Sequence, residues 1–267
     1  MNARLLLALT VFAAAPALPQ LAAPNAAGVS IGHIHLNVTD MDAQERFWTE
    51  VGGKMVNRGK LRMAQFPGIY VILRKQDPTG PSVGSSINHF GFYVKDFDAS
   101  VAKWKADGLN WEKGNNPGQG FLNGPDGVRV EIYENKTMSG PIMMHHIHLF
   151  VTDPIAAQKW YVDNFGATPG KRGAFDTANV PGTEISLNKA DKLQVPTEGR
   201  VVDHMGFEVK GIDAFVAKLQ AAGIKTDAAI RTSANAAGLR IVYVTDPWGT
   251  KIEITEGLPP TSQSASR

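Results

Sequence analysis

The chain has 267 residues, enough for about two domains at roughly 150 residues per domain. Hydrophobic residues make up 43% and charged residues 19%, values that exclude a collagen or a long coiled coil. The net charge of +2 provides no broad basic surface, so we expect no nucleic-acid partner. Because the chain has no cysteine, disulfides, thiolate metal sites and thiol nucleophiles are excluded, and a metal would need His, Asp or Glu ligands.

Residues 1–23 have the layout of a secretory signal peptide. A basic residue precedes an apolar run over residues 5–15, and small residues follow it. This run is too short to span a bilayer, which takes roughly 20 residues, although an N-terminal membrane anchor is the alternative. We therefore expect a secreted or periplasmic protein with no stable membrane insertion after cleavage. The mature chain would begin between residues 18 and 28.

Four segments of the first half recur in the same order in the second half. The matched pairs are 33–40 with 146–153, 66–75 with 180–189, 88–104 with 203–219, and 123–132 with 245–254. Such ordered repetition predicts two copies of one module, because chance similarity would not preserve the order four times. We expect the first module over 29–137, the second over 142–257 and a disordered tail over 258–267.

Each module contains a smaller unit twice. A His-bearing strand is followed by a helix and then by short β-rich runs separated by Gly, Pro and Asn. Asp40 and Asp153 follow the first strand of each module and are expected to cap a helix. The helices DAQERFWTEVGG and IAAQKWYVDNFG end at glycines, which tolerate a left-handed C-terminal turn. The pattern predicts an α+β fold in which strand–helix–three strands occurs four times.

Two histidines and one glutamate of each module lie on strand faces opposite the apolar residues. In the first strand, Ile34 and Leu36 share one face, which leaves His33 on the other. The candidate ligands are His33, His89 and Glu131 in the first module and His146, His204 and Glu253 in the second. A single strand histidine is more often structural, but recurrence in both modules favours a divalent metal. Fe(II), Mn(II), Zn(II), Ni(II) and Co(II) are all compatible with this ligand set.

The ordered motifs resemble the vicinal oxygen chelate superfamily, which includes glyoxalases, epimerases, extradiol dioxygenases and bleomycin-resistance proteins. The motifs are an H-x-x-L-x-V-x-D opening, an aromatic helix ending in Gly, a second His strand and a D-P-x-G-x-x-x-E close, spread over residues 29–257. The resemblance implies two tandem modules, each of paired βαβββ units that form a cupped mixed sheet around a site. It assigns the six candidate ligands to the metal, but it specifies the fold better than the reaction.

One departure from the family concerns a fourth metal ligand. Glyoxalase-type relatives usually carry it on the last strand of the first unit, where this chain has Ile72 and Ser186. Neither residue is a good ligand, although Glu184 shares the face of Ser186 and could substitute. A site with three ligands resembles the extradiol dioxygenases instead.

The second module carries the richer chemistry under this resemblance. The dioxygenase signature fits VYVTDPWGTKIE, which contains Tyr243, whereas the first module has Phe121 there. The histidine that begins that signature is replaced by residues 233–236, so proton transfer would fall to Tyr243, His145 or His148. We take Tyr243 and His148 as the candidate catalytic residues. His148, like His35, could equally support a ligand from behind or simply pack in the fold.

The sequence thus predicts an exported divalent-metal-dependent enzyme that acts on a small-molecule substrate with adjacent oxygens. The reaction would be dioxygenase-, lyase- or isomerase-like, with the metal as Lewis acid. One alternative is a metal-free binding protein of the bleomycin-resistance type, in which Phe150 and Trp248 would grip a small ligand. A glyoxalase-like lyase and a structural protein with relic sites are the others.

Overall fold

The computed structural model describes residues 21–259. Most of the predicted signal peptide (residues 1–20) and most of the predicted tail (260–267) lie outside the described residues. Leu258, which we assigned to a disordered tail, is fully buried, and its backbone N–H donates to the Glu208 carboxylate. Within the described part, none of the helices is long and apolar enough to span a membrane.

The described chain folds as four successive units, each with a strand, a helix and three further strands. Unit 1 comprises β1 (Val29–Val38), α1 (Met41–Val51), β2 (Lys54–Arg58), β3 (Leu61–Phe66) and β4 (Ile69–Lys75). Unit 2 comprises β5 (Ile87–Val94), α2 (Phe97–Ala106), β6 (Trp111–Lys113), β7 (Gln119–Asn123), the 3₁₀ turn η1 (Pro125–Gly127) and β8 (Arg129–Glu134).

The second module repeats this order. Unit 3 comprises β9 (Ile142–Val151), α3 (Pro154–Phe165), β10 (Thr168–Arg172), β11 (Phe175–Val180) and β12 (Thr183–Lys189). Unit 4 comprises β13 (Val202–Val209), α4 (Ile212–Ala221), β14 (Arg231–Thr232), β15 (Arg240–Thr245) and β16 (Lys251–Glu256). The predicted α+β fold with a fourfold strand–helix–three-strand repeat is confirmed.

The helix boundaries follow from the residues expected to set them. The Asp40 carboxylate accepts from the backbone N–H groups of the first turn of α1, and Asp153 does the same for α3. Gly166 ends α3 with φ 65°, in the left-handed region that glycine tolerates. These short-range predictions are confirmed because a cap needs only neighbouring residues.

The strands form two eight-stranded mixed sheets, and each sheet joins units from different modules. One sheet has the order β14-β15-β16-β13-β1-β4-β3-β2, which unites units 4 and 1. The other has the order β10-β11-β12-β9-β5-β8-β7-β6, which unites units 3 and 2. The expectation that each module closes its own sheet is wrong. The repeat shows that the units are alike, but it does not specify which units pair. The antiparallel pairs β1–β13 and β5–β9 join segments far apart in the chain and from different modules.

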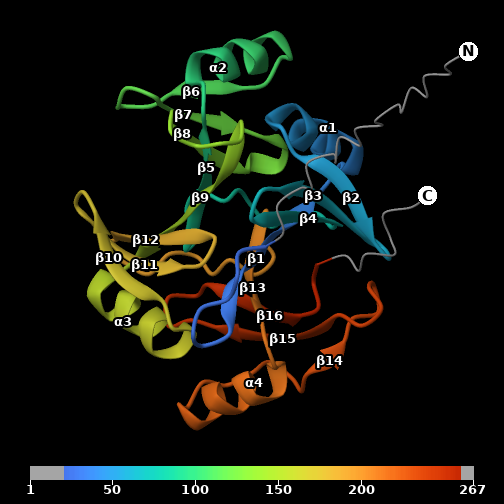
Figure 1. Ribbon diagram of the computed structural model, residues 1–267, viewed down its shortest axis with the longest axis vertical. Helices are drawn as coiled ribbons and strands as arrows, with labels where there is room; N and C mark the ends of the chain where they lie inside the picture. Colours follow the sequence, from blue (N-terminus) through green and yellow to red (C-terminus); the bar gives the residue numbers. More distant parts are fainter. Residues whose placement is uncertain (1–20, 260–267) are drawn as a thin grey trace, which may run out of the picture.

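Units of the same module meet instead through their apolar faces. Trp48 of α1 is fully buried and stacks on Phe90 of β5, with ring centroids 5.8 Å apart. In the second module, Phe165 of α3 contacts Phe207 of β13 at 4.8 Å. The helices lie on the outside of the molecule and the strands between them (Figure 1). The two units of one module therefore pack together through a common apolar core. The other face of each sheet combines strands from both modules.

Candidate metal sites

Site A consists of His33, His35, His204 and Glu253, and one ligand atom from each lies within 4.8 Å of all the others. The register of the paired strands brings these side chains together, since His35 of β1 lies opposite His204 of β13. Gly206 of β13 pairs with His33 on one side and Glu253 of β16 on the other. Ligand atoms about 2.0–2.2 Å from a zinc ion are at most about 4.4 Å apart, so the cluster is close to coordination distance.

Site B consists of His89, Glu131, His146 and His148, again with ligand atoms within 4.8 Å of one another. Its register is the same: His148 pairs with His89, and Gly91 lies between His146 and Glu131. Six of the chain's seven histidines lie in the two sites, and His145 contacts site B through His146, with their Nδ1 atoms 3.0 Å apart.

All six predicted ligands therefore lie in a site, but their assignment to modules is wrong. Site A takes His33 from the first module and His204 and Glu253 from the second. Site B takes His146 from the second module and the other two predicted ligands from the first. His35 and His148, for which a supporting or packing role was an alternative, join the ligand clusters. Their spacing of two residues from His33 and His146 on a strand was the signal that could have assigned them.

A glycine makes room for one histidine ring in each site. A Cβ atom added at Gly206 would lie 1.9 Å from Cε1 of His33, and one added at Gly91 would lie 2.5 Å from Cε1 of His146. Both imidazole rings thus lie directly over a strand where no side chain can stand. The glycine is a packing requirement of the site.

Unpaired imidazole nitrogens make these histidines suitable metal ligands. Both ring nitrogens of His33 and His35, and Nε2 of His146 and His148, are buried without a hydrogen-bond partner among residues 21–259. Leaving such a buried group unsatisfied costs about 1–3 kcal/mol. Nε2 of His33 lies 2.9 Å from a Glu253 oxygen, so the nitrogen and the carboxylate converge on one point. Imidazole and carboxylate together suit a divalent transition metal.

The protonation states also fit a metal. Burial lowers the pKa of His33 and His35, and it lowers the pKa of His148 to about 3, so these rings are neutral near pH 7. Burial acts to raise the pKa of Glu253, but the close His204 and His33 rings outweigh it and hold the carboxyl ionised. Neutral imidazole and ionised carboxylate are the forms that bind metal.

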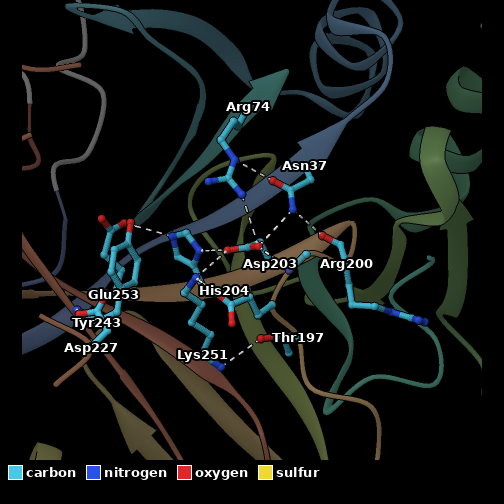
Figure 2. Close-up of polar contacts among 12 residues, drawn as sticks. Asn37, Arg74, Thr197, Arg200, Asp203, His204, Asp227, Tyr243, Lys251 and Glu253 are labelled. Atoms are coloured by element: carbon cyan, nitrogen blue, oxygen red, sulfur yellow. Dashed lines mark hydrogen bonds and ion pairs between the residues drawn. The ribbon is translucent and has the colours of Figure 1, made fainter. Parts of the chain in front are cut away.

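A charged network supports His204 of site A (Figure 2). Its Nδ1 lies 2.5 Å from Oδ1 of Asp203, which leaves Nε2 directed at Glu253 at 3.1 Å. The other Asp203 oxygen accepts from Asn37 Nδ2 at 3.1 Å and from the Gly199 backbone N–H at 2.7 Å. Although burial acts to lower it, the pKa of His204 is raised by Asp203 and Glu253. Such outer partners set the tautomer and the orientation of a ligating histidine.

Site B has a neutral version of this support. Oδ1 of Asn88 lies 2.9 Å from Nδ1 of His89, whose Nε2 faces Glu131 at 3.1 Å. Asn88 occupies the position of Asp203 in the repeat. The geometry is therefore matched in the two sites, while the charge behind the histidine differs.

The two predicted catalytic residues lie at different sites. Tyr243 pairs with Glu253 across β15 and β16, and its ring centroid is 5.3 Å from that of His204, so it belongs to site A. His148 lies in site B. The expectation that they serve one site is therefore wrong. Burial first, and then the charge of Glu253, raise the pKa of Tyr243, so the phenol stays protonated and can donate a hydrogen bond.

A cavity of about 270 Å³ lies beside site A, and its walls include His35, Tyr243 and Glu253. Ile72, where the family pattern expects a fourth ligand, lines this cavity next to its strand partner His35. Ser233, Ala234 and Asn235, three of the four residues at the position of the dioxygenase histidine, form part of the wall. None of the site B residues lines this cavity.

Bulky and paired side chains surround site B. The Phe175 ring lies 5.0 Å from His148, and the Phe121 ring lies 5.7 Å from His89. The Arg172 guanidinium donates to Glu184 at 2.7 Å and to Ser186 at 2.8 Å. Glu184, the possible substitute ligand, is thus held by Arg172 and is not among the clustered ligand residues.

The two aromatic residues considered for a metal-free binder lie apart from the cavity. Trp248 is buried in the main hydrophobic core. Phe150 lies beside His148 of site B, with ring centroids 5.5 Å apart. Neither lines the cavity at site A.

Comparison with known proteins defines the family. The profile of the Glyoxalase/Bleomycin resistance protein/Dioxygenase superfamily matches residues 30–132 and 143–254. Glyoxalase I from Zea mays shares the fold, with a TM-score of 0.68 at 17% identity over 85% of this chain and 92% of that one. A putative dioxygenase from Bacillus subtilis subsp. subtilis str. 168 gives 0.65 at 14% identity over 86% of both chains. No curated protein sequence matches significantly. The chain therefore belongs to the Glyoxalase/Bleomycin resistance protein/Dioxygenase superfamily.

Proposed function

We propose that the protein is a divalent-metal-dependent enzyme that acts on a small substrate with two adjacent oxygens, and that the reaction takes place at site A. The observation that carries this proposal is a cluster of three histidines and a glutamate, with unpaired buried nitrogens, in the wall of a cavity. An open metal site beside a small cavity is what a chelated substrate requires.

The residues of site A divide into ligands and groups that act on the substrate. His33, His35, His204 and Glu253 would hold the ion, which supplies Lewis acidity when bound. Asp203 keeps the proton of His204 on Nδ1, so that Nε2 stays available as a ligand.

Tyr243 is the proton donor in this proposal. It lines the cavity as a protonated phenol next to Glu253. A positioned acid of this kind stabilises negative charge that develops on a substrate oxygen, and such groups contribute about 10²–10⁴-fold to a rate.

The surroundings of site A favour proton transfer, as in a lyase or an isomerase, over ring cleavage. Ser233, Ala234 and Asn235 carry no side chain that exchanges protons near neutral pH. Tyr243 is the phenol of the cavity wall, and it stays protonated, so it can donate to a substrate oxygen. We therefore expect exchange or isomerisation next to a carbonyl, and no oxygen consumption.

Two matched variants test this proposal. The chain is stripped with a chelator, reloaded with each of the five candidate metals and assayed for metal content by mass spectrometry. Turnover of 2-oxoaldehydes and 2-hydroxyketones is followed by NMR in D₂O, and catechols are tested with an oxygen electrode. We expect two ions per wild-type chain, because sites A and B offer equivalent ligands.

Glu253→Gln should remove one ion and all turnover, whereas Glu131→Gln should remove one ion and leave turnover intact. Tyr243→Phe should keep both ions and lower the rate by about 10²-fold or more. A chain that binds no divalent metal at micromolar concentration would overturn the proposal. Oxygen uptake with catechols would replace the proton-transfer chemistry with ring cleavage.

We also propose that the protein is exported, on the strength of the signal-like residues 1–23. We expect the signal peptide to be cleaved on the N-terminal side of Asn25, since the Asn25 side chain donates to the backbone carbonyls of Phe165 and Gly166 at the end of α3. Cleavage before Asn25 keeps these contacts. The mass of the protein recovered from a periplasmic fraction tests this, and an uncleaved chain in the cytosol would contradict it.

A further inference from the structure

We propose that the substrate bound in the cavity at site A carries an anionic group, such as a carboxylate, and that Arg74 and Arg231 bind it. This inference rests on the proposed function, because it concerns the far end of the same substrate. Its starting observation is that two arginines line the cavity, whereas Glu253 is the one acidic residue in the wall.

Arg74 is held in position with donors to spare. Its Nε donates to Oδ1 of Asn37 at 2.8 Å, and its Nη2 lies 3.4 Å from Oδ2 of Asp203 (Figure 2). A guanidinium has five N–H donors, and Nη1 of Arg74 makes no hydrogen bond to another described residue. The side chain is 41% exposed. Arg74 therefore presents a fixed, accessible N–H pair to the cavity.

Arg231 is the second arginine of the cavity wall and, unlike Arg74, has no acidic partner. Its guanidinium lies over the Tyr243 ring, 5.3 Å from the centroid. No carboxylate in residues 21–259 lies within 4.0 Å of it, whereas Lys251, on the same ring, is paired with Glu198 at 2.5 Å. An unpaired arginine in a cavity wall binds carboxylate or phosphate more strongly than it binds water, because the charged hydrogen bonds can be bidentate.

Site B shows that this arrangement is specific to site A. The two arginines near its ligands are both neutralised, Arg172 by Glu184 at 2.7 Å and Arg129 by Glu112 at 2.9 Å. The repeat position of Arg74 is Asn188, which carries no charge. Arg231, which has no acidic partner, and Arg74, which shares Asp203 with other donors, thus line the cavity at site A.

The volume limits the size of the ligand. A cavity of about 150 Å³ holds benzene, so 270 Å³ accommodates a single ring or a short chain with a few substituents. The metal side would take two adjacent oxygens, and the arginines would take the anion. We therefore assign a small carboxylate, or a comparable anion, that also bears vicinal oxygens.

A pair of probes that differ in charge and match in shape tests this assignment. The binding of 3,4-dihydroxybenzoate and 3,4-dihydroxybenzamide to the full Zn²⁺-loaded chain is measured by calorimetry without oxygen. We expect the carboxylate to bind about 10–100-fold more tightly, the range that corresponds to one charge-assisted hydrogen-bond pair. Arg231→Gln should reduce this preference to about threefold or less, and the exposed helix variant Arg46→Gln should leave it unchanged.

Other outcomes separate the two proposals. Equal affinity for the two probes in the wild-type chain overturns the anion assignment and leaves the proposed function standing. A preference that survives in Arg231→Gln and in Arg74→Gln also overturns it, provided that metal content and circular dichroism show both variants folded. If metal binds but neither probe does, chelation of adjacent oxygens fails, and the anion assignment fails with it.

Discussion

Sites A and B have the same ligands in the same register but different surroundings. Each joins two histidines from the first strand of one unit to a histidine and a glutamate from another, with a glycine between. Beyond the ligands the sites diverge: Tyr243 and Asp203 of site A correspond to Phe121 and Asn88 of site B. The comparison teaches that the repeat reproduces the residues that could hold a metal and not those that would act on a substrate.

The largest expected effect comes from the glycine beneath each histidine. In Gly206→Ala the new methyl group would lie 1.9 Å from the His33 ring, so the ring must move out of site A. Such overpacking costs about 1–3 kcal/mol of unfolding free energy. We expect the chain to lose one metal ion and the melting temperature to fall, as measured by mass spectrometry and calorimetry.

Gly91→Ala provides the comparison at site B, where the approach is 2.5 Å and we expect a smaller loss. Gly140→Ala is the control, since its Cβ would come no closer than 4.0 Å to another residue's atom. Two ions retained in Gly206→Ala would show that the register does not position His33 as described.

A smaller effect is expected from the outer partners of the histidines. Asp203→Asn removes the charge behind His204 and should lower metal affinity at site A by about 10–100-fold. The reciprocal change, Asn88→Asp, should raise the affinity at site B. Competition with a chromophoric chelator measures both constants. If the two exchanges leave both affinities unchanged, the charged partner is not what distinguishes the sites.

The smallest effect concerns His145, which has no counterpart at site A because the repeat has Gly32 there. Burial, helped by the charge of Arg172, lowers the pKa of His145 to about 4. Since the unfolded chain titrates near 6.5, it binds more protons than the folded chain between pH 6.5 and 4. This contribution to stability is therefore present at pH 7 and is lost as the pH falls.

Urea unfolding of the metal-free chain at pH 7 and pH 5 tests this linkage. His145→Gln should reduce the loss of stability between the two pH values by about 1–2 kcal/mol. Tyr93→Phe is the control, because it alters the ring that stacks on His145 at 3.8 Å without removing an imidazole. An unchanged pH dependence in His145→Gln would contradict the assignment.

Short-range features were predictable from the residues themselves. Asp40 and Asp153 cap helices, and His33 lies opposite Ile34, because a cap and a strand face depend only on neighbouring positions. The fourfold unit and six of the eight clustered residues of the two sites followed from the repeat in the same way. Tyr243 was correctly associated with Glu253 because the two residues lie on adjacent strands of one hairpin.

The partners of each ligand were not predictable in this way. His33 and His204 meet because β1 pairs with β13, and nothing in the local pattern of either strand specifies which distant strand it joins. The same pairing explains why His148 lies away from Tyr243, although the repeat assigns both to one module. The proposed role of Arg74 and Arg231 was not predictable from the sequence either, because the cavity wall combines β4 of unit 1 with β14 of unit 4.

The sequence by itself determined the class of site: without cysteine, seven histidines and their matching glutamates leave imidazole and carboxylate as the ligands for a metal. The sequence also determined the strand–helix–three-strand unit, because hydrophobic periodicity and helix caps depend only on residues a few positions apart. Only the tertiary structure decided which units share a sheet, and hence that each site is built between modules. The physical reason is that antiparallel pairing of β1 with β13 and of β5 with β9 satisfies backbone hydrogen bonds between segments far apart in the chain.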